Sequence, residues 1–526
     1  MENNKQNIKT YLDLLSENSL VEEYNLCGKE DTLIEHITYA SGDVKPGTLF
    51  ICKGAGFKKE YLEDAISKGA AVYVSEVEHD LSGESACADN FPYIIVKDVR
   101  KAMPLIARTF YNNVDEKLTI IGLTGTKGKT TTAYYIKAIL DDYLEAEGKP
   151  KSAILASIET YDGVSTDEAM ITTPESFEIF RHFNNAVNSG IEYITMEVSS
   201  QALKYGRSDN IVFDVGMFLN ISEDHISPIE HSDFRDYFDA KLNIFKQTKI
   251  ACISTNTEHY AEIMDAAAQC SSTTPAQPIE KVVLFGTKGG PDILGTDISI
   301  DDGIISFNAH FEDYSVERIT LAMPGTFNVE NALAAIAATR ELGIPKEYMI
   351  SGLGRATVAG RMELYQSEDG IIRALVDYAH NKLSYQRLYD SVLEEHPGYD
   401  IVTVFGCPGG KAKNRRSELG TIAGQYSKKV ILVPEDPNME PPAEISKEIG
   451  VYLDAEGCPY EYFEDRAEGI AKTIAETTTK TIFLVLGKGT EDVQKSMGGY
   501  VPFIPDGKAI EMGLEEYNKT LNVTVI

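Results

Sequence analysis

The 526-residue chain lacks the features that mark exported or membrane proteins. Its seven cysteines are odd in number, widely spaced and free of any C-x-x-C pair, which favours reduced thiols over a disulfide framework. It has no apolar run of about 18 residues, the length that spans a bilayer. The stretch from Met1 to Ser19 is polar and lacks the apolar core of a secretory leader. We therefore expect a cytoplasmic protein, most simply a monomer.

Positive charge is also scarce. The chain has 49 Lys and Arg against 81 Asp and Glu, a formal net charge of −32. Such a surface repels phosphate backbones and anionic lipid headgroups, so neither nucleic acid nor a membrane is an expected partner. A small anionic substrate is still compatible with this charge, because a few local cations and backbone N–H groups can hold it.

What remains is an ordinary globular composition, with 43% hydrophobic and 25% charged residues. Domains average about 150 residues, so the length predicts three of them. Apolar runs alternate with helical patterns, which favours an α/β fold. We predict a small N-terminal α/β domain (1–113), a central α/β domain of the P-loop type (114–357) and a C-terminal Rossmann-like α/β domain (358–526). Residues 280–323 lack the alternation and are expected to form hairpin-like strands, with a turn at Asp301-Asp302-Gly303.

A glycine-rich segment, G-L-T-G-T-K-G-K-T from Gly122 to Thr130, follows an apolar run and precedes a helical pattern. This is the context of a phosphate-binding loop, in which backbone N–H groups and the helix N-terminus face the phosphates. The segment departs from the strict Walker motif by one residue, because Leu123 stands where the motif has its first glycine. A glycine-rich turn beside a surface lysine is the less favoured alternative. The residues predicted to bind ATP are Gly125, Thr126, Lys127, Gly128, Lys129, Thr130 and Thr131. Lys129 would neutralise phosphate charge and the Thr130 hydroxyl would reach Mg²⁺.

Further short motifs occur in a fixed order along nearly the whole chain. They are T-T-P-E at 172–175, M-E-V-S-S at 196–200, D-H at 224–225, A-K at 240–241, G-R-M-E at 360–363, D-Y-A-H at 377–380, D-R at 465–466 and G-K-G-x-E at 487–491. With the phosphate loop, this series resembles the Mur ligase family, the ATP-dependent amide-forming enzymes of peptidoglycan precursor synthesis. The T-T-P-E and G-K-G-x-E segments resemble the branch that adds an amino acid to UDP-N-acetylmuramoyl-L-alanyl-D-glutamate. The resemblance implies ATP and Mg²⁺ as cofactors, and the UDP-muramoyl dipeptide and a free amino acid as partners.

The chemistry of such a ligase can be stated from elementary principles. A carboxylate must first acquire a leaving group, so the γ-phosphoryl of ATP is transferred to it to give an acyl phosphate. The resemblance implies Lys129, Glu197, His225 and Lys241 as catalytic residues. It implies that Thr130, Glu197, His225 and Lys241 hold metal, with Lys241 carrying a CO₂-derived carbamate. A surface lysine on an amphipathic helix is the alternative for Lys241, and the stretch between His225 and Lys241 is about two residues longer than the family pattern.

The remaining substrate contacts are also implied by the resemblance. For the nucleotide they are Asn328, Asn331, Arg361 and Asp377. A helix cap at Asn328 and an Asx turn at Asp377 are the structural alternatives. For the UDP substrate, bound mainly by the first domain, they are Ser41, Thr172, Thr173, Ser199 and Arg207. Gly42, Gln201 and Tyr205 depart from the family pattern, which leaves the uridine contacts open.

The third domain is expected to choose the amino acid. In relatives that add meso-diaminopimelate, a D-N-P-R loop grips the distal carboxylate with its arginine, and Asn438 takes that place here. A neutral amide cannot compensate a second carboxylate, whereas Glu435 and Asp436 can attract a side-chain ammonium. This favours L-lysine, with ornithine or meso-diaminopimelate as alternatives. Lys411 is implied at the α-carboxylate and Gly487 and Glu491 at the α-amino side. The neighbouring Lys413, Arg415 and Arg416 could instead be a solvated basic loop.

Two other function classes stay open at this stage. One is a related amide ligase similar to folylpolyglutamate synthase, against which the T-T-P-E segment and the additional N-terminal domain argue. The other is a non-catalytic nucleotide-binding regulatory protein, which the departures at Gly42 and Gln201 permit.

Overall fold

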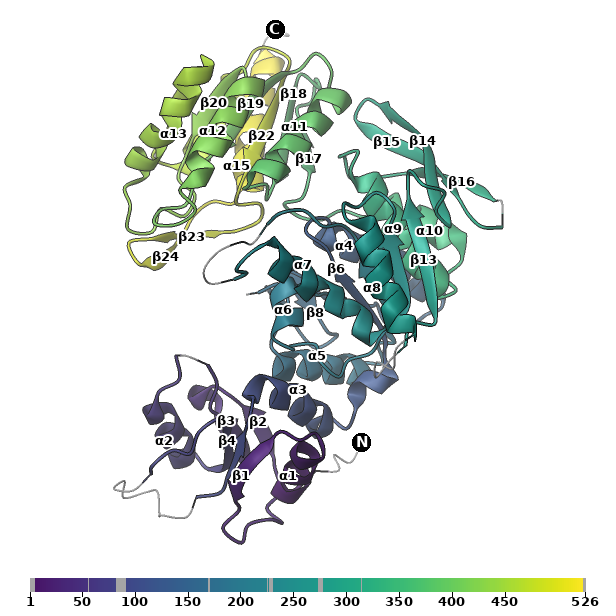
Figure 1. Cartoon of the computed structure of the whole chain (residues 1–526). Helices are drawn as coiled ribbons and strands as arrows, with labels where there is room; N and C mark the ends of the chain where they lie inside the picture. Colours follow the sequence, from purple (N-terminus) through teal and green to yellow (C-terminus); the bar gives the residue numbers. More distant parts are fainter. Residues whose placement is uncertain are drawn as a thin grey trace. The chain divides into compact units, whose positions relative to one another are not determined.

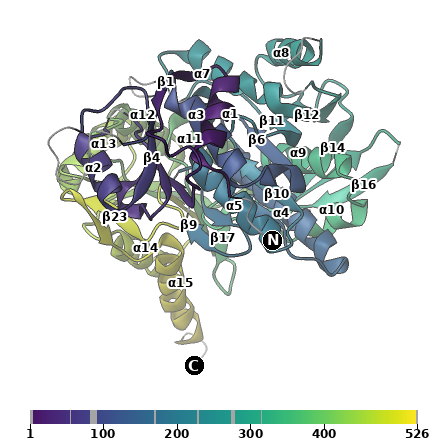
Figure 2. The same ribbon diagram turned by 90° about the horizontal axis from the view of Figure 1, so that it is seen from below.

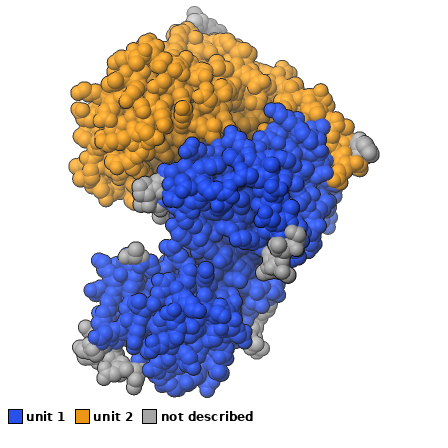
Figure 3. Space-filling model, in the orientation of Figure 1, with its two compact units in different colours: residues 1–294, 333–349 blue, residues 295–332, 350–526 orange. Residues whose placement is uncertain are grey.

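A computed structural model of the chain describes residues 5–54, 56–81, 91–168, 171–224, 226, 230–272, 278–313 and 315–523 (Figure 1). It contains two compact units: unit 1 comprises residues 1–294 and 333–349, and unit 2 comprises residues 295–332 and 350–526 (Figure 3). The N-terminal and central segments share unit 1, and the predicted boundaries at 113 and 357 stay predictions. In the described part of the chain, no helix is both long and apolar enough to cross a membrane.

The N-terminal segment of unit 1 is a five-stranded sheet in the order β1-β5-β4-β3-β2. Its strands are β1 (Val21–Asn25), β2 (His36–Thr38), β3 (Thr48–Ile51), β4 (Ala70–Ser75) and β5 (Tyr93–Val96), and its helices are α1 (Ile8–Glu17), η1 (Ser41–Asp43), α2 (Lys59–Ser67) and α3 (Val99–Phe110). All pairs from β2 to β5 are parallel, and β1 adds antiparallel to β5. Strand β3 is buried along its whole length, as expected for a strand covered on both faces.

The central segment of unit 1 continues with a second sheet. Its elements are η2 (Val114–Lys117), β6 (Thr119–Thr124), α4 (Lys129–Ala146), β7 (Ala153–Leu155), β8 (Glu159–Tyr161), β9 (Thr166–Glu168), α5 (Ser176–Asn188), β10 (Tyr193–Glu197), α6 (Ser200–Lys204), β11 (Phe213–Phe218), α7 (Phe234–Leu242), η3 (Asn243–Gln247), β12 (Thr248–Ser254), α8 (Tyr260–Ser272) and β13 (Lys281–Gly286). The order is β13-β12-β11-β6-β10-β7-β8-β9, parallel from β13 to β7. Because β13 extends the parallel sheet, the expectation that hairpin strands begin at residue 280 was wrong for that strand.

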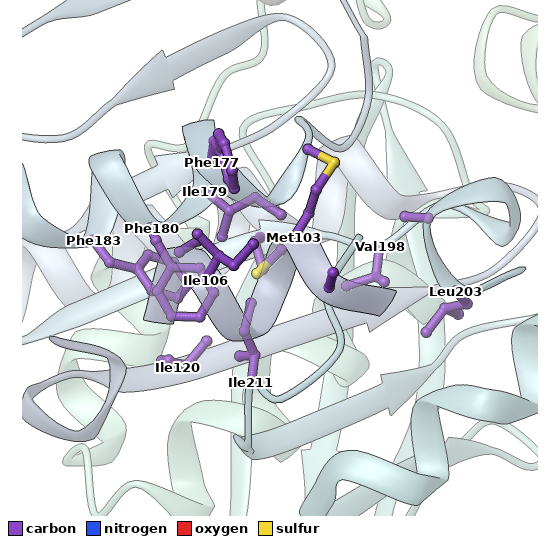
Figure 4. Packing of buried hydrophobic residues seen from close by; sticks show 14 of the residues in the cluster. Met103, Ile106, Ile120, Phe177, Ile179, Phe180, Phe183, Val198, Leu203 and Ile211 are labelled. Carbon is purple, nitrogen blue, oxygen red and sulfur yellow. The ribbon is translucent and has the colours of Figure 1, made fainter. Parts of the chain in front are cut away.

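One hydrophobic core joins the two segments of unit 1. Met103 and Ile106 of α3 lie beside Phe180 and Phe183 of α5 (Figure 4). The two phenylalanine rings meet edge to face with centroids 5.7 Å apart, a favoured aromatic geometry. The same cluster of buried side chains continues to Ile120 of β6, so the strand that leads into the phosphate loop is anchored in this core.

Unit 2 begins within β14 (Ile293–Asp301). Its other elements are β15 (Ile304–His310), β16 (Val316–Thr320), the first part of α9 (Asn328–Glu341), the second half of α10 (Lys346–Leu353), β17 (Glu363–Gln366), β18 (Ile372–Asp377), α11 (Lys382–Glu395), β19 (Asp400–Phe405), α12 (Asn414–Tyr426), β20 (Lys429–Leu432), α13 (Pro442–Glu456), β21 (Tyr460–Tyr462), α14 (Arg466–Ala475), β22 (Thr481–Leu486), β23 (Val493–Ser496), β24 (Gly499–Pro502) and α15 (Asp506–Val523). The predicted turn is confirmed, with Asp302 and Gly303 between β14 and β15 and both at positive φ.

The C-terminal sheet of unit 2 has the order β17-β18-β22-β19-β20-β21, parallel except for β17 at one edge. Alternate residues of β18 point to opposite faces. Leu375 joins the core beneath α11, α12 and α13, whereas Val376 joins the core beneath α14 and α15. Helix α15 packs on α14 and leads to the C-terminus (Figure 2). Helices therefore cover both faces, as in a Rossmann-like domain.

The close packing of the central sheet predicts a stability effect at Gly122 in β6. A Cβ added there would lie 2.6 Å from the ring of Phe213, so Gly122→Ala should lower the unfolding free energy by about 1–3 kcal/mol through overpacking. Gly42→Ala is the control, because no heavy atom lies within 4 Å of its Cβ position. It should change stability by less than about 0.5 kcal/mol. Urea unfolding of the three proteins measures the difference, and equal midpoints would contradict the packing argument.

Candidate active site

The phosphate loop joins β6 to α4, as the sequence predicted. Gly128 has a φ of +84°, a left-handed conformation that glycine adopts without strain. A Cβ on Gly125 would lie 3.0 Å from the Cβ of Leu219, so any larger residue at this position would have to displace Leu219 slightly. The loop therefore approaches its neighbour closely and turns directly into the N-terminus of α4, where backbone N–H groups favour an anion.

A segment after β11 holds the loop in shape. Asn220 accepts a hydrogen bond from the Lys127 N–H at 2.9 Å and donates to the Lys127 carbonyl at 3.0 Å. Its own carbonyl accepts from the Thr126 N–H at 3.0 Å. Sequence reasoning missed Asn220. Its position two residues beyond an apolar strand was the available signal.

Two lysines converge on one carbonyl of this loop. Lys129 Nζ lies 3.0 Å from the Gly125 oxygen and Lys241 Nζ lies 2.8 Å from the same atom. Lys241 is buried on α7, so the alternative of a surface lysine was wrong. Its burial, together with repulsion from Lys129, holds the pKa of Lys241 well below its usual range. Tyr237, one turn earlier on α7, donates to the Thr126 hydroxyl at 3.1 Å.

Glu197 lies buried at the end of β10, beside the start of α4. Its Oε1 accepts from the N–H and the hydroxyl of Ser157 at 2.8 and 3.0 Å, and that hydroxyl lies 2.9 Å from the Thr130 hydroxyl. In the described part of the chain, its Oε2 has no hydrogen-bond partner. Carboxylate and hydroxyl oxygens are ligands that Mg²⁺ prefers. The unpartnered buried oxygen therefore fits a divalent cation, and Ser157 is a member of this group that the sequence did not reveal.

The predicted metal set mixes residue types, because Thr130, Glu197, His225 and Lys241 include only one histidine and one carboxylate. Among the described residues, no group of three or more His, Cys, Asp and Glu side chains is gathered. His225 lies outside the described residues, so its role stays a prediction. The neighbouring Asp224 forms an ion pair with Lys127 at 3.2 Å, which places Asp224 beside the phosphate loop.

Three of the residues predicted for the UDP substrate lie together. The Thr173 hydroxyl donates to the Glu197 carbonyl at 3.0 Å and accepts from the Ser199 N–H at 2.9 Å. Arg207 donates to the Thr173 carbonyl at 3.2 Å and pairs through Nε with Glu175 at 3.0 Å. This group therefore adjoins Glu197 directly.

The other two predicted residues are less closely tied to this group. Thr172 immediately precedes Thr173 and is partly exposed. Ser41 lies in η1, where its carbonyl accepts from Lys68 at 3.0 Å, and no contact in the described part of the chain links it to Arg207. Sequence reasoning missed Lys53, which pairs with Glu175 at 2.7 Å from the N-terminal segment. The pair joins residues 122 positions apart, so no local signal marked it.

The nucleotide candidates of unit 2 make well-defined local contacts. Asn328 is the first residue of α9 rather than its cap, and its amide donates to the Pro324 carbonyl at 2.6 Å. Asn331 donates to the Asn328 side chain at 2.9 Å. The Asx turn proposed for Asp377 is present, because its Oδ1 accepts from the Ala379 N–H at 2.8 Å.

Arg361, the fourth nucleotide candidate, stacks its guanidinium on the Tyr378 ring at 4.7 Å. Its Nε is buried and, within the described part of the chain, has no hydrogen-bond partner. Whether these four side chains contact a nucleotide stays a prediction.

The amino-acid candidates lie on loops that follow β19, β20 and β22, whose carboxyl ends share one edge of the sheet. Arg466 is buried beneath two of these loops and forms a bidentate pair with Asp506 at 2.6 and 2.7 Å. It also donates to the carbonyls of Leu486 and Pro434 at 2.9 and 3.4 Å. These bonds hold together the residues just before Gly487 and Glu435. The Cβ position of Gly487 lies 3.3 Å from the Glu435 carboxylate.

The two predicted carboxylates differ in their partners. Asp436 accepts from Lys488 at 3.1 Å, and Lys488 also pairs with Glu491. The Lys488 ammonium therefore already compensates the charge of both Asp436 and Glu491. Glu435 forms no ion pair within the described part of the chain. Burial raises the pKa of Glu435 to about 7, against the opposing charges of Arg466 and Arg415. Glu435 is thus the better candidate for a substrate ammonium.

Asn438 and the basic loop are more structured than the sequence indicated. Asn438 has a φ of +54° and donates to the Gly409 carbonyl at 3.0 Å. Lys411 and Lys413 are exposed, whereas Arg416 is 2% exposed and pairs with Glu440. The alternative of a solvated basic loop was therefore wrong for Arg416.

Comparison with known proteins identifies the family. Residues 123–339 match the Mur ligase middle domain and residues 360–489 match the Mur ligase glutamate ligase domain. The chain is 35% identical over 519 residues to an Enterococcus faecalis protein, covering 96% of this chain and 97% of that one. This chain belongs to the Mur ligase family.

The names of its relatives indicate which branch of the family this chain resembles. The E. faecalis protein and a Streptococcus mutans protein, 34% identical over 95% of this chain and 98% of its own, are named UDP-N-acetylmuramoyl-L-alanyl-D-glutamate--L-lysine ligase. A solved UDP-N-acetylmuramoyl-L-alanyl-D-glutamate--2,6-diaminopimelate ligase shares the fold, with a TM-score of 0.66 and 21% identity over 97% of this chain and 99% of its own. Folylpolyglutamate synthase from Mycobacterium tuberculosis shares it over only 73% of this chain and 92% of its own, with a TM-score of 0.55 and 14% identity.

The raised pKa of Glu435 predicts a pH dependence of stability in this Mur ligase. Its folded-state pKa of about 7 exceeds the ordinary value of 4.5. Ionisation therefore costs stability, and the unfolding free energy should fall as the pH rises from 4.5 to 7. Glu435→Gln should remove this loss and be the more stable protein at pH 8 by up to about 3 kcal/mol, yet similar to wild type at pH 4.5. Glu461→Gln, at an exposed ion pair with Lys429, is the control. Parallel Tm profiles for wild type and Glu435→Gln would contradict the assignment.

Proposed function

We propose that this Mur ligase joins L-lysine to UDP-N-acetylmuramoyl-L-alanyl-D-glutamate at the expense of ATP, in the cytoplasm, as a step of peptidoglycan precursor synthesis. The observation that carries the proposal is the similarity, over nearly the whole length, to relatives with that printed name. The chemistry of the 434–440 loop supports the choice of amino acid, because the loop contains no arginine and its Glu435 forms no ion pair with the described residues.

The first step activates the substrate carboxylate. Its oxygen attacks the γ-phosphorus of ATP, and the bond between that phosphorus and the bridging oxygen of the β-phosphate breaks. The products are ADP and an acyl phosphate. Backbone N–H groups of the phosphate loop, the N-terminus of α4 and the Lys129 ammonium would compensate the phosphate charge. Thr130 and Glu197, with His225 and a carbamylated Lys241, would hold Mg²⁺, which supplies further charge neutralisation when bound.

The second step forms the amide. The neutral α-amine of the amino acid attacks the acyl carbon, the carbon–oxygen bond to phosphate breaks, and inorganic phosphate and a proton are released. Lys411 would hold the α-carboxylate, while Glu435 would receive the side-chain ammonium. Gly487 and Glu491 would line the α-amino side, and Asp436, bound to Lys488, would shape the loop.

The remaining substrate contacts follow the same assignment. Asn328, Asn331, Arg361 and Asp377 are proposed for the nucleotide. Ser41, Thr172, Thr173, Ser199 and Arg207 are proposed for the UDP-muramoyl dipeptide. The nearness of Thr173 to Glu197 supports a substrate carboxylate close to the phosphate loop.

Carbamylation of Lys241 would resolve a conflict of charge. Two ammonium groups that bind the same buried Gly125 carbonyl would repel each other. Lys241 forms no ion pair in the described part of the chain that would offset this repulsion. A neutral Lys241 amine can attack CO₂, form a nitrogen–carbon bond and release a proton. The resulting carbamate is anionic and would offer oxygen ligands to a cation.

The carbamate predicts a specific chemical rescue. Lys241→Ala should lose turnover by about a thousandfold, the scale of removing one electrostatic catalytic group, and added formate or acetate should restore part of it. Lys246→Ala is the control, since Lys246 is an exposed lysine on the next turn, and it should keep wild-type turnover. Carbon-13 NMR under labelled CO₂ should show a carbamate signal in wild type and none in Lys241→Ala. A signal common to both would contradict the assignment.

The choice of amino acid tests the proposed function. Phosphate release should require both the UDP-muramoyl dipeptide and an amino acid, which neither a folylpolyglutamate synthase nor a regulatory protein would show. L-Lysine should exceed meso-diaminopimelate in kcat/KM by tens to thousands of times, because losing one partner of a buried charge pair costs about 2–5 kcal/mol.

Substitution of Asn438 separates charge from backbone strain. Asn438→Arg should narrow or reverse the preference for L-lysine. Asn438→Gln is the control, because it meets the same left-handed backbone without adding a charge. A wild-type preference for meso-diaminopimelate would overturn the assignment of the loop.

A further inference from the structure

The two loops that carry Lys411 and Glu435 are joined directly to each other. The Gly409 N–H donates to the Asp436 carbonyl at 2.9 Å, and the Gly410 N–H donates to Glu440 Oε2 at 3.0 Å. A Cβ on Gly409 would lie 1.9 Å from the Pro437 oxygen, so the backbones approach as closely as glycine allows. The contact therefore ties the backbone of the loop that carries Lys411 to the loop that carries Glu435.

Arg416 of α12 supports the contact from beneath. Its Nη1 and Nη2 each donate to one oxygen of Glu440 at 2.8 Å, and its Nη2 donates to the Pro408 carbonyl at 3.3 Å. The planar guanidinium thus bonds both loops at once, through Glu440 on one and Pro408 on the other. Hydrogen bonds from Arg416 and the Gly410 N–H lower the pKa of Glu440 to about 2, so the pair is charged throughout the working range of pH.

A second carboxylate binds the same arginine, and it belongs to a helix rather than to either loop. Glu448 lies on α13, is half-exposed and accepts from Arg416 Nη1 at 2.6 Å. Of these two carboxylates, only Glu440 belongs to the 434–440 loop, and only Glu440 accepts a hydrogen bond from the Gly410 N–H.

We propose that the Arg416–Glu440 pair is a positioning clamp that sets the distance between Lys411 and Glu435 and thereby selects the chain length of the incoming amino acid. The inference rests on the proposed function. An amino acid whose α-carboxylate binds Lys411 and whose ammonium binds Glu435 must span a set distance, and ornithine is one methylene shorter than lysine. A rigid pocket separates two substrates that differ by one methylene by about 10–200-fold in kcat/KM. A pocket whose two ends can move apart separates them less well.

The test compares Glu440→Gln with Glu448→Gln in the full-length enzyme, using L-lysine and L-ornithine as substrates. Glu440→Gln should raise the KM for L-lysine by about tenfold, the scale of a hydrogen bond to a charged group, and should lower the lysine-to-ornithine ratio of kcat/KM by a similar factor. The KM values for ATP and the UDP-muramoyl dipeptide should stay within about twofold of wild type. Glu448→Gln should leave all of these values near wild type.

Arg416→Lys provides a second variant that keeps the positive charge but cannot donate in parallel to both Glu440 oxygens. It should reproduce the loss of discrimination, which covers the case in which Glu440→Gln fails to fold. Unchanged lysine-to-ornithine ratios in folded Glu440→Gln or Arg416→Lys would overturn the clamp alone. A wild-type enzyme that releases phosphate with neither amino acid would overturn the proposed function together with the clamp.

Discussion

Both units depend on the geometry of parallel sheets, in which the carboxyl ends of neighbouring strands meet at one edge. In unit 1 this edge brings together the phosphate loop after β6, Glu197 at the end of β10 and Asn220 after β11. In unit 2 it brings together the loops after β19, β20 and β22. Loops at such an edge are free to carry polar groups, because the strands beneath supply the buried core.

Buried cations then give these loops their shape. Arg416, Arg466 and Lys488 are almost wholly enclosed, and each has a carboxylate partner together with further contacts. A buried charge is tolerated only when it is paired and hydrogen-bonded, so each cation fixes the carboxylates and carbonyls that surround it. Lys241 is the exception: its partners are a carbonyl, a hydroxyl and an aromatic ring. The pKa of Lys241 is accordingly held well below its usual range, whereas the pKa values of Arg416, Arg466 and Lys488 are raised.

Local patterns predicted much of the architecture. The apolar run before the phosphate loop became β6, the helical pattern after it became α4, and the Asp-Gly turn lies between β14 and β15 as expected. The treatment of residues 280–323 as hairpin strands failed at β13, because pairing with β12 depends on a partner about thirty residues away. The reading of Arg416 as a solvated charge failed for a similar reason, since Glu440 and α13 enclose it.

The amino-acid sequence by itself determined the order of the motifs, the family they resemble and the absence of an arginine at position 438. These are properties of residue type and spacing, which need no knowledge of distant contacts. Only the tertiary structure decided which carboxylates already form ion pairs within the protein. Asp436 pairs with Lys488, Glu440 pairs with Arg416, and Glu175 pairs with Lys53 and Arg207. It also revealed Ser157 and Asn220 beside the phosphate loop. Each of these contacts joins residues 24 or more positions apart, and the fold, rather than local propensity, brings such residues within hydrogen-bonding distance.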